Sequence, residues 1–301
     1  MEQSEIDAYV EAGDIAKEIK SFARGLIKPG MLLIDIAKGI DDKIFELGAT
    51  PAFPVNLSMN EIAAHYTPAP GDETIAEGLL KIDIGVAVEG YIADTAFSVD
   101  LTEDGEFKEM MELNEKLLTE ATNVVKAGME VKDIGEAVQD TLEKWNDDND
   151  SSFAVIKSLC GHSLAQGQIH AGLTISNYKN ENKTVFDNDA FAVEPFVTTG
   201  VGDIYEGPTG GIYVLQSDDN VRDRDTRKLL NYIKETFGTL PFCERWIDTD
   251  EFKKIKFSLS TMEKQGILHH YPQLIEKSRK PVSQFENTFV ISEDKVICTT
   301  C

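Results

Sequence analysis

The sequence of 301 residues predicts an α+β fold in which two similar α/β halves follow one another in the chain. The first reason is an internal repeat: residues 27–46 and 125–144 align without a gap at a constant offset. The second is that a long amphipathic pattern precedes each copy and strand-like sequence follows it. Two duplicated halves that meet at a pseudo-two-fold axis leave a crevice between them, where we expect a functional site.

The two copies share the residues that end one helix and begin the next. Identical pairs occur at Lys28/Lys126, Gly30/Gly128, Met31/Met129, Asp35/Asp133, Ile36/Ile134 and Asp42/Asp140. A long helix, at about 5–26 or 106–126, is expected before each Gly-Met turn, where glycine tolerates the left-handed conformation that stops the chain. A second helix is expected to begin near Asp35 in the first copy and near Asp133 in the second. The common turn and helix register favour duplication over chance.

Residues 81–98 predict a β-hairpin that carries two acids. Apolar and polar residues alternate before Glu89-Gly90, which is a two-residue turn signal. With that turn, Asp83 lies opposite Ala96, and Asp94 lies diagonally across from Asp83 on the same face. A register shift of one residue would send the two carboxylates to opposite faces. The alternative is that one aspartate is solvated on an edge strand and the other caps a turn.

The second half places further metal-ligand residue types in strand-like sequence. His162 and His170 lie eight residues apart in a glycine-rich stretch, Glu194 ends an apolar run, and Glu286 alternates with Phe285 within a predicted strand. Carboxylates do not suit apolar strands without a partner. Gathered in one crevice, these acids and the two of the hairpin would repel one another, and two divalent cations would balance their charge.

A ligand set of carboxylates with imidazole suits Mn²⁺, Fe²⁺, Co²⁺ or Zn²⁺. Two such ions about 3.5–4 Å apart can share a hydroxide and hold the carbonyl that it attacks, which is the chemistry of amide hydrolysis. His65 lies in the loop-like stretch 60–68 before the hairpin, and a solvated loop histidine is the alternative there. The pair His269-His270 is expected to be exposed.

The pattern becomes helical after about residue 205. Amphipathic helices are expected over 223–237 and 251–268 with no strand between them, and the strand pattern returns only at 281–291. This stretch is therefore interpreted as a helical insertion into the duplicated unit.

Composition limits the partners and the location of the protein. The 29 basic and 53 acidic residues give a net charge of −24, which repels nucleic acid and anionic membranes when basic residues do not cluster. No run of 18 apolar residues exists and the first residues are acidic, so a cytoplasmic location is expected. Cys298 and Cys301 form one CxxC, which is interpreted as incidental rather than as a redox centre.

Taken together, these residues resemble the type II methionine aminopeptidases, in the short form that is typical of archaea. The resemblance covers essentially the whole chain and rests on residues 52–56, 60–68, 81–96, 161–172, 191–196 and 284–288. It implies the pita-bread (creatinase/aminopeptidase) fold, with a catalytic domain of residues 1–214 and 283–301. It also implies that the helical subdomain 215–282 is the insertion that distinguishes type II from type I enzymes.

The resemblance implies a site with two divalent metal ions. Asp83 would chelate one ion, Asp94 and Glu286 would bridge both, and His162 and Glu194 would complete the shell of the second. The family usually has histidine after the last ligand, where this chain has Asn287. Because side chains alternate along a strand, Asn287 should point away from the metals if Glu286 points toward them.

The resemblance also implies catalytic and substrate-binding residues. The histidine that matches His170 approaches the scissile carbonyl and helps to polarise it. The one that matches His65 lies beside the substrate amine and is alkylated by fumagillin-like epoxides. Glu194 would accept a proton from the attacking water, and Phe53 and Ile169 match residues that line the methionine pocket.

The activity expected from the resemblance is removal of the initiator methionine from nascent polypeptides with a small second residue. The protein is expected to act as a monomer, at the ribosome, without direct contact to nucleic acid or membrane. One alternative is an X-Pro dipeptidase or aminopeptidase P, although those enzymes usually carry an extra N-terminal domain that this chain is not expected to have. The other is a pita-bread pseudoenzyme that binds RNA or protein, although all five ligand positions are filled here.

Overall fold

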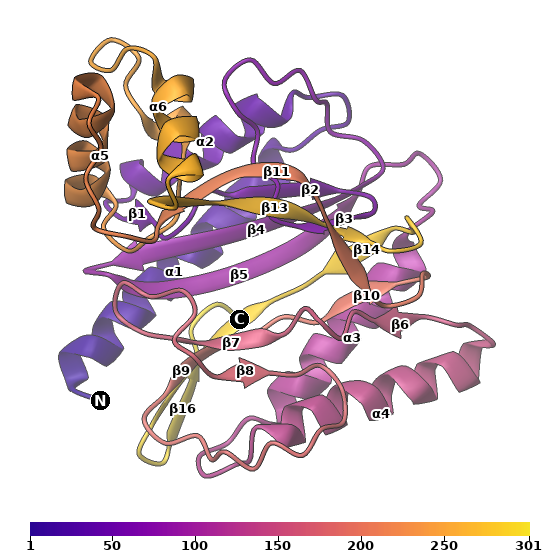
Figure 1. Ribbon diagram of the computed structural model, residues 1–301. Helices are drawn as coiled ribbons and strands as arrows, with labels where there is room; N and C mark the ends of the chain where they lie inside the picture. Colours follow the sequence, from indigo (N-terminus) through magenta and orange to yellow (C-terminus); the bar gives the residue numbers. More distant parts are fainter.

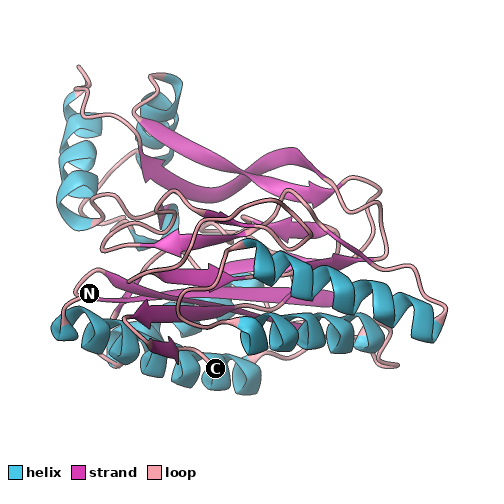
Figure 2. Cartoon of the chain, turned by 90° about the horizontal axis from the view of Figure 1, so that it is seen from below, coloured by secondary structure: helices cyan, strands magenta, loops and turns pink.

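Long helices lie along one side of the strands in the computed structural model, which describes residues 1–301 (Figures 1 and 2). The first half contains α1 (Gln3–Leu26), α2 (Leu33–Glu46), β1 (Thr50–Pro51), β2 (Asn56–Met59), β3 (Ile62–Ala64), β4 (Leu79–Val88) and β5 (Tyr91–Asp100). The second contains α3 (Lys108–Val124), α4 (Lys132–Asn149), β6 (Ala154–Val155), β7 (Gly161–Leu164), β8 (Thr174–Ile175), β9 (Ala190–Val193) and β10 (Phe196–Thr198).

The remaining elements follow the second half in the chain. They are β11 (Ile204–Leu215), α5 (Arg224–Thr236), β12 (Phe242–Cys243), the 3₁₀ turn η1 (Glu244–Trp246), α6 (Ile255–Lys264), β13 (Leu268–Glu276), β14 (Val282–Gln284), β15 (Asn287–Ser292) and β16 (Lys295–Cys298). Figure 1 shows β14 and β16, in yellow, beside the strands of the two halves, away from α5 and α6. No helix of the structure combines the length and apolar character needed to cross a bilayer.

The repeated segment takes the same conformation in both halves. Gly30 and Gly128 have φ angles of +80° and +74°, so each turn uses the left-handed conformation that glycine adopts without strain. Leu32 and Glu130, which occupy equivalent places in the repeat, each form an isolated antiparallel bridge with a later residue. The helix–turn–helix pattern expected from the repeat is therefore confirmed.

One apolar core joins the halves. A cluster of 41 buried residues draws on α1 to α4 and on the strands of both halves. Small residues such as Ala12 and Ala16 let α1 lie close to β4 and β5, and fully buried rings include Phe97, Phe191 and Phe289. Each fully buried phenylalanine contributes about 1.5–3 kcal/mol to stability. This shared core holds the inner faces of the two halves in a fixed relation.

The hairpin of β4 and β5 has the predicted register. Val88 pairs with Tyr91 and Asp83 with Ala96, while Asp94 pairs with Gly85. Both turn residues have positive φ, as a two-residue turn with the right-handed twist of the strands requires. The prediction is confirmed, and it places Asp83 and Asp94 on one face.

The expectation of a purely helical insertion is wrong. The strands β11 and β13 pair over nearly their whole length, and the short β12 lies between α5 and α6. The pattern was hidden because glycine and proline interrupt β11, whose pairing with β13 contains two register shifts. Most of β13 is only partly buried, so it lacks the apolar alternation that identifies a strand.

A buried ion pair attaches the insertion to the first half. The guanidinium of Arg245 lies 3.0 Å from Asp41 Oδ2, and the indole N–H of Trp246 donates to the same oxygen. Arg245 also donates to Thr67 Oγ1 and to the carbonyl of Pro68. Since a buried charge needs a partner, these contacts fix the insertion against the segment that follows His65.

Candidate active site

The nine residues that the sequence singled out line one cavity of about 280 Å³ between the two halves. They are Phe53, His65, Asp83, Asp94, His162, Ile169, His170, Glu194 and Glu286. The first four come from the first half, the next four from the second, and Glu286 from the returning segment. The crevice expected between duplicated halves is therefore present, and chemistry-bearing side chains from distant parts of the chain meet in it.

Five ligand-type side chains reach the cavity from five places in the fold. Asp83 lies on β4, Asp94 on β5 and His162 on β7, while Glu194 directly follows β9. Glu286 was expected inside a continuous strand, but it lies in the break between β14 and β15. The backbone N–H of Glu286 donates to the carbonyl of Ala96 on β5, outside the regular strand pairing of β14 and β15.

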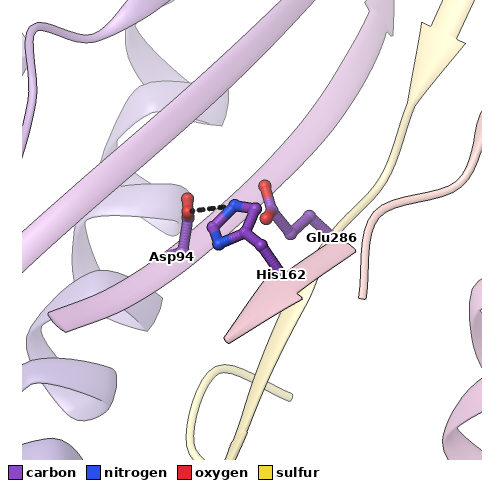
Figure 3. A group of neighbouring side chains, drawn as sticks. All are labelled: Asp94, His162 and Glu286. Carbon is purple, nitrogen blue, oxygen red and sulfur yellow. Dashed lines mark ion pairs between the residues drawn. The ribbon is translucent and has the colours of Figure 1, made fainter. Parts of the chain in front are cut away.

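Three of these side chains form a compact group, which Figure 3 shows converging. One potential ligand atom from each of Asp94, His162 and Glu286 lies within 4.8 Å of the others. His162 Nε2 is 3.6 Å from Asp94 Oδ2 and 3.7 Å from Glu194 Oε1. The side-chain amide of Gln284 donates to both Asp83 and Glu194, so all five side chains are contiguous.

The carboxyl groups of the cavity are in an environment that opposes their ionisation. Burial raises the pKa of Asp83 to about 7. Burial, and then repulsion by neighbouring carboxylates, raises the pKa of Asp94, Glu194 and Glu286 well above the ordinary range. Both effects disfavour negative charge. Only a counterion within the cavity would allow the four acids to ionise together near neutral pH.

The donor set fits divalent cations. Asp83 Oδ1, Asp94 Oδ1 and both carboxyl oxygens of Glu286 are buried without a hydrogen-bond partner. Burial lowers the pKa of His162 to about 3, so its ring is neutral and offers a lone pair. Carboxylate oxygens with one imidazole suit Mn²⁺, Fe²⁺, Co²⁺ and Zn²⁺ better than softer ions. A bound divalent cation would satisfy the oxygens that have no hydrogen-bond partner.

Two further histidines lie beside the ligand group. The rings of His170 and His162 are 4.2 Å apart in an edge-to-face arrangement. His170 does not lie in a strand as expected, but in the irregular stretch that follows the turn after β7. Burial lowers the pKa of His170, and lowers that of His65 to about 4. Both rings are therefore neutral at pH 7 and able to donate or accept one hydrogen bond each.

His65 has a strained backbone that the insertion supports. Its φ of +66° is uncommon for a residue with a side chain and costs of order 1–3 kcal/mol. Asn56 Oδ1 accepts the hydrogen bond from its N–H, and a Cβ at Gly210 would lie 1.6 Å from its carbonyl oxygen. The ring packs edge-to-face on Tyr271 of β13. Glycine in β11 therefore lets the insertion reach His65.

Several residues of the site escaped sequence reasoning. Gln284 Nε2 is 3.4 Å from both Asp83 and Glu194, and Asn56 pairs with Asp83 across β2 and β4. Gln284 is two positions before Glu286, and that spacing in a strand pattern was the available signal. Tyr271 and Leu274 line the cavity from β13. No sequence pattern indicated that position, because the strand itself was not predicted.

The structure corrects the interpretation of His270, which is not an exposed residue. Its side chain is 10% exposed, stacks on Tyr213 at 3.9 Å and lies 3.7 Å from Glu263. Its Nε2 accepts a hydrogen bond from the N–H of Gly211. The pair was misjudged because it lies on β13 rather than in a helix; His269, its neighbour, is exposed as expected.

The side chain of Asn287 lies away from the ligand group, as alternation predicts. Its Oδ1 accepts a hydrogen bond from the hydroxyl of Thr300, behind the sheet. The amide therefore takes part in sheet packing and contributes no atom to the ligand group.

Comparison with known proteins agrees with this architecture. The model of metallopeptidase family M24 matches residues 7–239. The chain is 44% identical to the methionine aminopeptidase of Pyrococcus abyssi over 301 residues, which cover 98% of this chain and 99% of the relative. It is 35% identical to that of Methanocaldococcus jannaschii over 302 residues, with 98% and 99% covered.

Solved structures with low identity show the same fold. A thermophilic Arx1 superposes with a TM-score of 0.80 at 16% identity, covering 99% of this chain and 91% of that one. The methionine aminopeptidase of Rickettsia prowazekii gives 0.68 at 19%, with 100% and 98% covered. The prolidase of Pyrococcus furiosus gives 0.59 at 16%, with 100% of this chain but 64% of the prolidase covered. With its pita-bread fold and its full-length relatives, this chain belongs to metallopeptidase family M24.

Proposed function

We propose that this protein removes the N-terminal methionine from peptides and nascent proteins whose second residue is small. The observation that carries the proposal is the meeting of five ligand-type side chains and an apolar pocket wall in one cavity. The 44% identity to a methionine aminopeptidase over nearly the full length of both chains supports the same substrate.

The proposed cofactor is a pair of divalent metal ions, drawn from cobalt, manganese, iron and zinc. Asp83 would hold one ion, Asp94 and Glu286 would bridge both, and His162 and Glu194 would complete the ligand set of the second ion. When bound, such ions activate water and polarise the amide carbonyl that it attacks. The ring of buried acids supports this assignment, because their charge needs a compensating cation.

The remaining roles fall to side chains that line the same cavity. Glu194 is proposed to take the proton from the attacking water, since its carboxyl is partly exposed to the cavity and bonded to Gln284. His170 is proposed to donate a hydrogen bond to the substrate carbonyl, and His65 to contact the substrate amine. Both roles require neutral imidazoles, which burial favours here.

The proposed methionine pocket is bounded by Phe53 and Ile169. Phe53 belongs to an apolar cluster separate from the main core, Ile169 packs against that cluster, and both line the cavity. An unbranched thioether side chain suits such a surface.

The proposed domain division keeps 1–214 and 283–301 as the catalytic unit and 215–282 as the insertion, which contributes Tyr271 and Leu274 to the cavity wall.

We further propose that the protein acts as a cytoplasmic monomer on chains that leave the ribosome. The net charge of −24 argues against direct binding to nucleic acid. The principal alternative is cleavage of X-Pro peptides, which the structural likeness to prolidases at 16% identity does not favour, since it shows only the fold.

The test is a comparison of two peptides with the protein loaded in turn with Mn²⁺, Fe²⁺, Co²⁺ or Zn²⁺. We expect release of methionine from a Met-Gly peptide and no cleavage of an X-Pro peptide of the same length. Preference for the X-Pro peptide, or inactivity with each of the four candidate metals, would contradict the proposal. Metal analysis of the protein as purified would identify the ion.

Gly85→Ala is expected to impair methionine binding while sparing the metals. A Cβ at Gly85 would lie 2.3 Å from the ring of Phe53, so the ring must move within the pocket. We expect KM for Met-Gly peptides to rise about tenfold, equivalent to about 1.4 kcal/mol, with unchanged Mn²⁺ affinity. Gly25→Ala is the matched control, since no atom lies within 4 Å of its added Cβ. An unchanged KM would exclude Phe53 as a pocket wall.

A further inference from the structure

A short segment behind the ligand group has no role in the proposed chemistry. After β16, Thr299 and Thr300 are only 2% and 1% exposed, and they are flanked by Cys298 and Cys301. The two cysteines form a disulfide, although the sequence suggested an incidental pair. Figure 2 shows the end of the chain, marked C, on the side of the molecule where the long helices lie.

The segment is packed tightly against α1 and β15. A Cβ added at Gly13 would lie 2.3 Å from the carbonyl oxygen of Thr299, so the helix backbone touches the segment directly. The N–H of Thr299 donates to the carbonyl of Thr288, and the N–H of Thr288 donates to Thr300 Oγ1. These bonds continue the pairing of β15 and β16 beyond the regular strands.

A hydrogen-bond chain leads from this segment to Asp94. Thr288, which is bonded to both threonines of the segment, donates its hydroxyl to the carbonyl of Asp94 at 2.8 Å. The same hydroxyl accepts the N–H of Asp94 at 2.8 Å. Both backbone groups of Asp94 that face β15 are therefore held by one side chain, whose own position depends on Thr300.

A second chain leads from the segment to Glu286. Lys20 Nζ donates to the carbonyl of Thr300 and to Thr95 Oγ1, and Thr95 in turn donates its hydroxyl to the carbonyl of Glu286. The segment is thus connected with the backbone of Asp94 and of Glu286. These are the two carboxylates proposed to bridge the metals.

We infer that the Cys298–Cys301 disulfide is a clasp that positions the proposed bridging ligands, with Thr300 and Thr288 as positioning residues; this inference rests on the proposed metal centre. By closing the chain around Thr299 and Thr300, the disulfide limits the conformations in which Thr300 holds Thr288. Partners that orient metal ligands typically change metal affinity by about 10–100-fold when they are lost. Cys301 is exposed, so a dithiol can reach the clasp.

The clasp can be opened by ordinary thiol–disulfide exchange. A thiolate of a dithiol attacks one sulfur of the clasp, forms a mixed disulfide and releases the other cysteine as a thiolate, which takes up a proton. The second thiol of the reagent then displaces the first cysteine. The products are two cysteine thiols and the oxidised, cyclic reagent.

The experiment measures Co²⁺ binding by visible absorption, with no substrate present. Protein treated with oxidised glutathione is compared with protein reduced by dithiothreitol, which is then removed without air. We expect the Co²⁺ dissociation constant to rise at least about tenfold on reduction, with shifted absorption bands. A double variant, Cys298→Ser with Cys301→Ser, should have the Co²⁺ dissociation constant of the reduced protein, and dithiothreitol should not change it. Since this variant lacks both thiols, that result would show that the weaker binding is not caused by free thiols that ligate the added metal.

Variants of Thr300 separate positioning from stabilisation. Thr300→Val removes the hydroxyl with the disulfide intact and should weaken Co²⁺ binding as much as reduction does. Thr300→Ser keeps the hydroxyl and should bind Co²⁺ as tightly as the wild type. The clasp would be overturned by equal Co²⁺ affinity and spectra before and after reduction, by wild-type affinity in Thr300→Val, or by four free thiols after glutathione treatment. Failure to cleave Met-Gly peptides, with these Co²⁺ effects present, would contradict only the proposed substrate.

Discussion

Replacing Asp94 by asparagine or Glu286 by glutamine is expected to lower peptidase activity by more than about 100-fold. Loss of a residue that merely orients a metal ligand costs about 10–100-fold, and these carboxylates are proposed to contact both ions themselves. Each variant keeps the size of the side chain and removes one charge. Because burial already opposes ionisation of both carboxyls, the fold should tolerate the neutral amides.

The measurement combines kcat/KM for a Met-Gly peptide with the number of Mn²⁺ ions bound per chain. Glu89→Gln is the matched control, since it removes one charge from the exposed turn of the same hairpin. We expect Asp94→Asn and Glu286→Gln to bind fewer ions, and the control to equal the wild type. Unchanged turnover and metal content in either ligand variant would exclude a bridging role for that residue.

The metal-free protein is expected to lose stability as the pH rises above 6.5. In the unfolded chain, carboxyl groups release their protons near pH 4. In the folded protein the pKa of Asp83 is about 7, and the pKa values of Asp94, Glu194 and Glu286 are raised well above the ordinary range. The folded state therefore holds more protons than the unfolded state across this interval. The free energy of unfolding then falls with pH, by about 1.4 kcal/mol per pH unit for each carboxyl still protonated.

The buried histidines act in the opposite direction, but only at lower pH. The pKa values of His162 and His65 are about 3 and about 4 in the folded protein, against about 6.5 in the unfolded chain. Their contribution to the free energy of unfolding rises with pH up to about 6.5 and is constant above it. The interval from pH 6.5 to 8 therefore excludes the histidines. Burial also lowers the pKa of Lys20 to about 8 and that of Lys81 well below its usual value, and these two amines oppose the fall in stability there. The contribution of one carboxyl is therefore obtained as the difference between the wild type and Asp94→Asn.

Thermal unfolding with and without a chelator checks this expectation. Tm of the chelated protein should fall between pH 6.5 and 8, and the increase in Tm on adding Mn²⁺ should grow over the same interval, because the ligands release protons when they bind metal. Asp94→Asn removes one of the titrating groups and should show a shallower fall. A fall in Tm that is as steep in Asp94→Asn as in the wild type would contradict the assignment of the protonated acids.

Local patterns predicted those parts of the fold whose partners are near in sequence. The turn at Glu89-Gly90 determined the hairpin register, and with it the shared face of Asp83 and Asp94, because a two-residue loop admits one pairing. The repeated glycines predicted the turns that follow α1 and α3. In contrast, β13 could not be identified, since its residues are partly exposed and it is stabilised by pairing with β11.

The sequence by itself determined which residue types carry the chemistry, because acids and histidines within apolar, strand-like stretches need partners wherever the chain takes them. Only the tertiary structure decided how they meet. It placed Glu286 in a break between two strands, brought Tyr271 to the cavity wall and set Thr288 behind Asp94. These contacts join residues as many as 194 positions apart, and no local period encodes such distances, because packing of the two halves around a shared core fixes them.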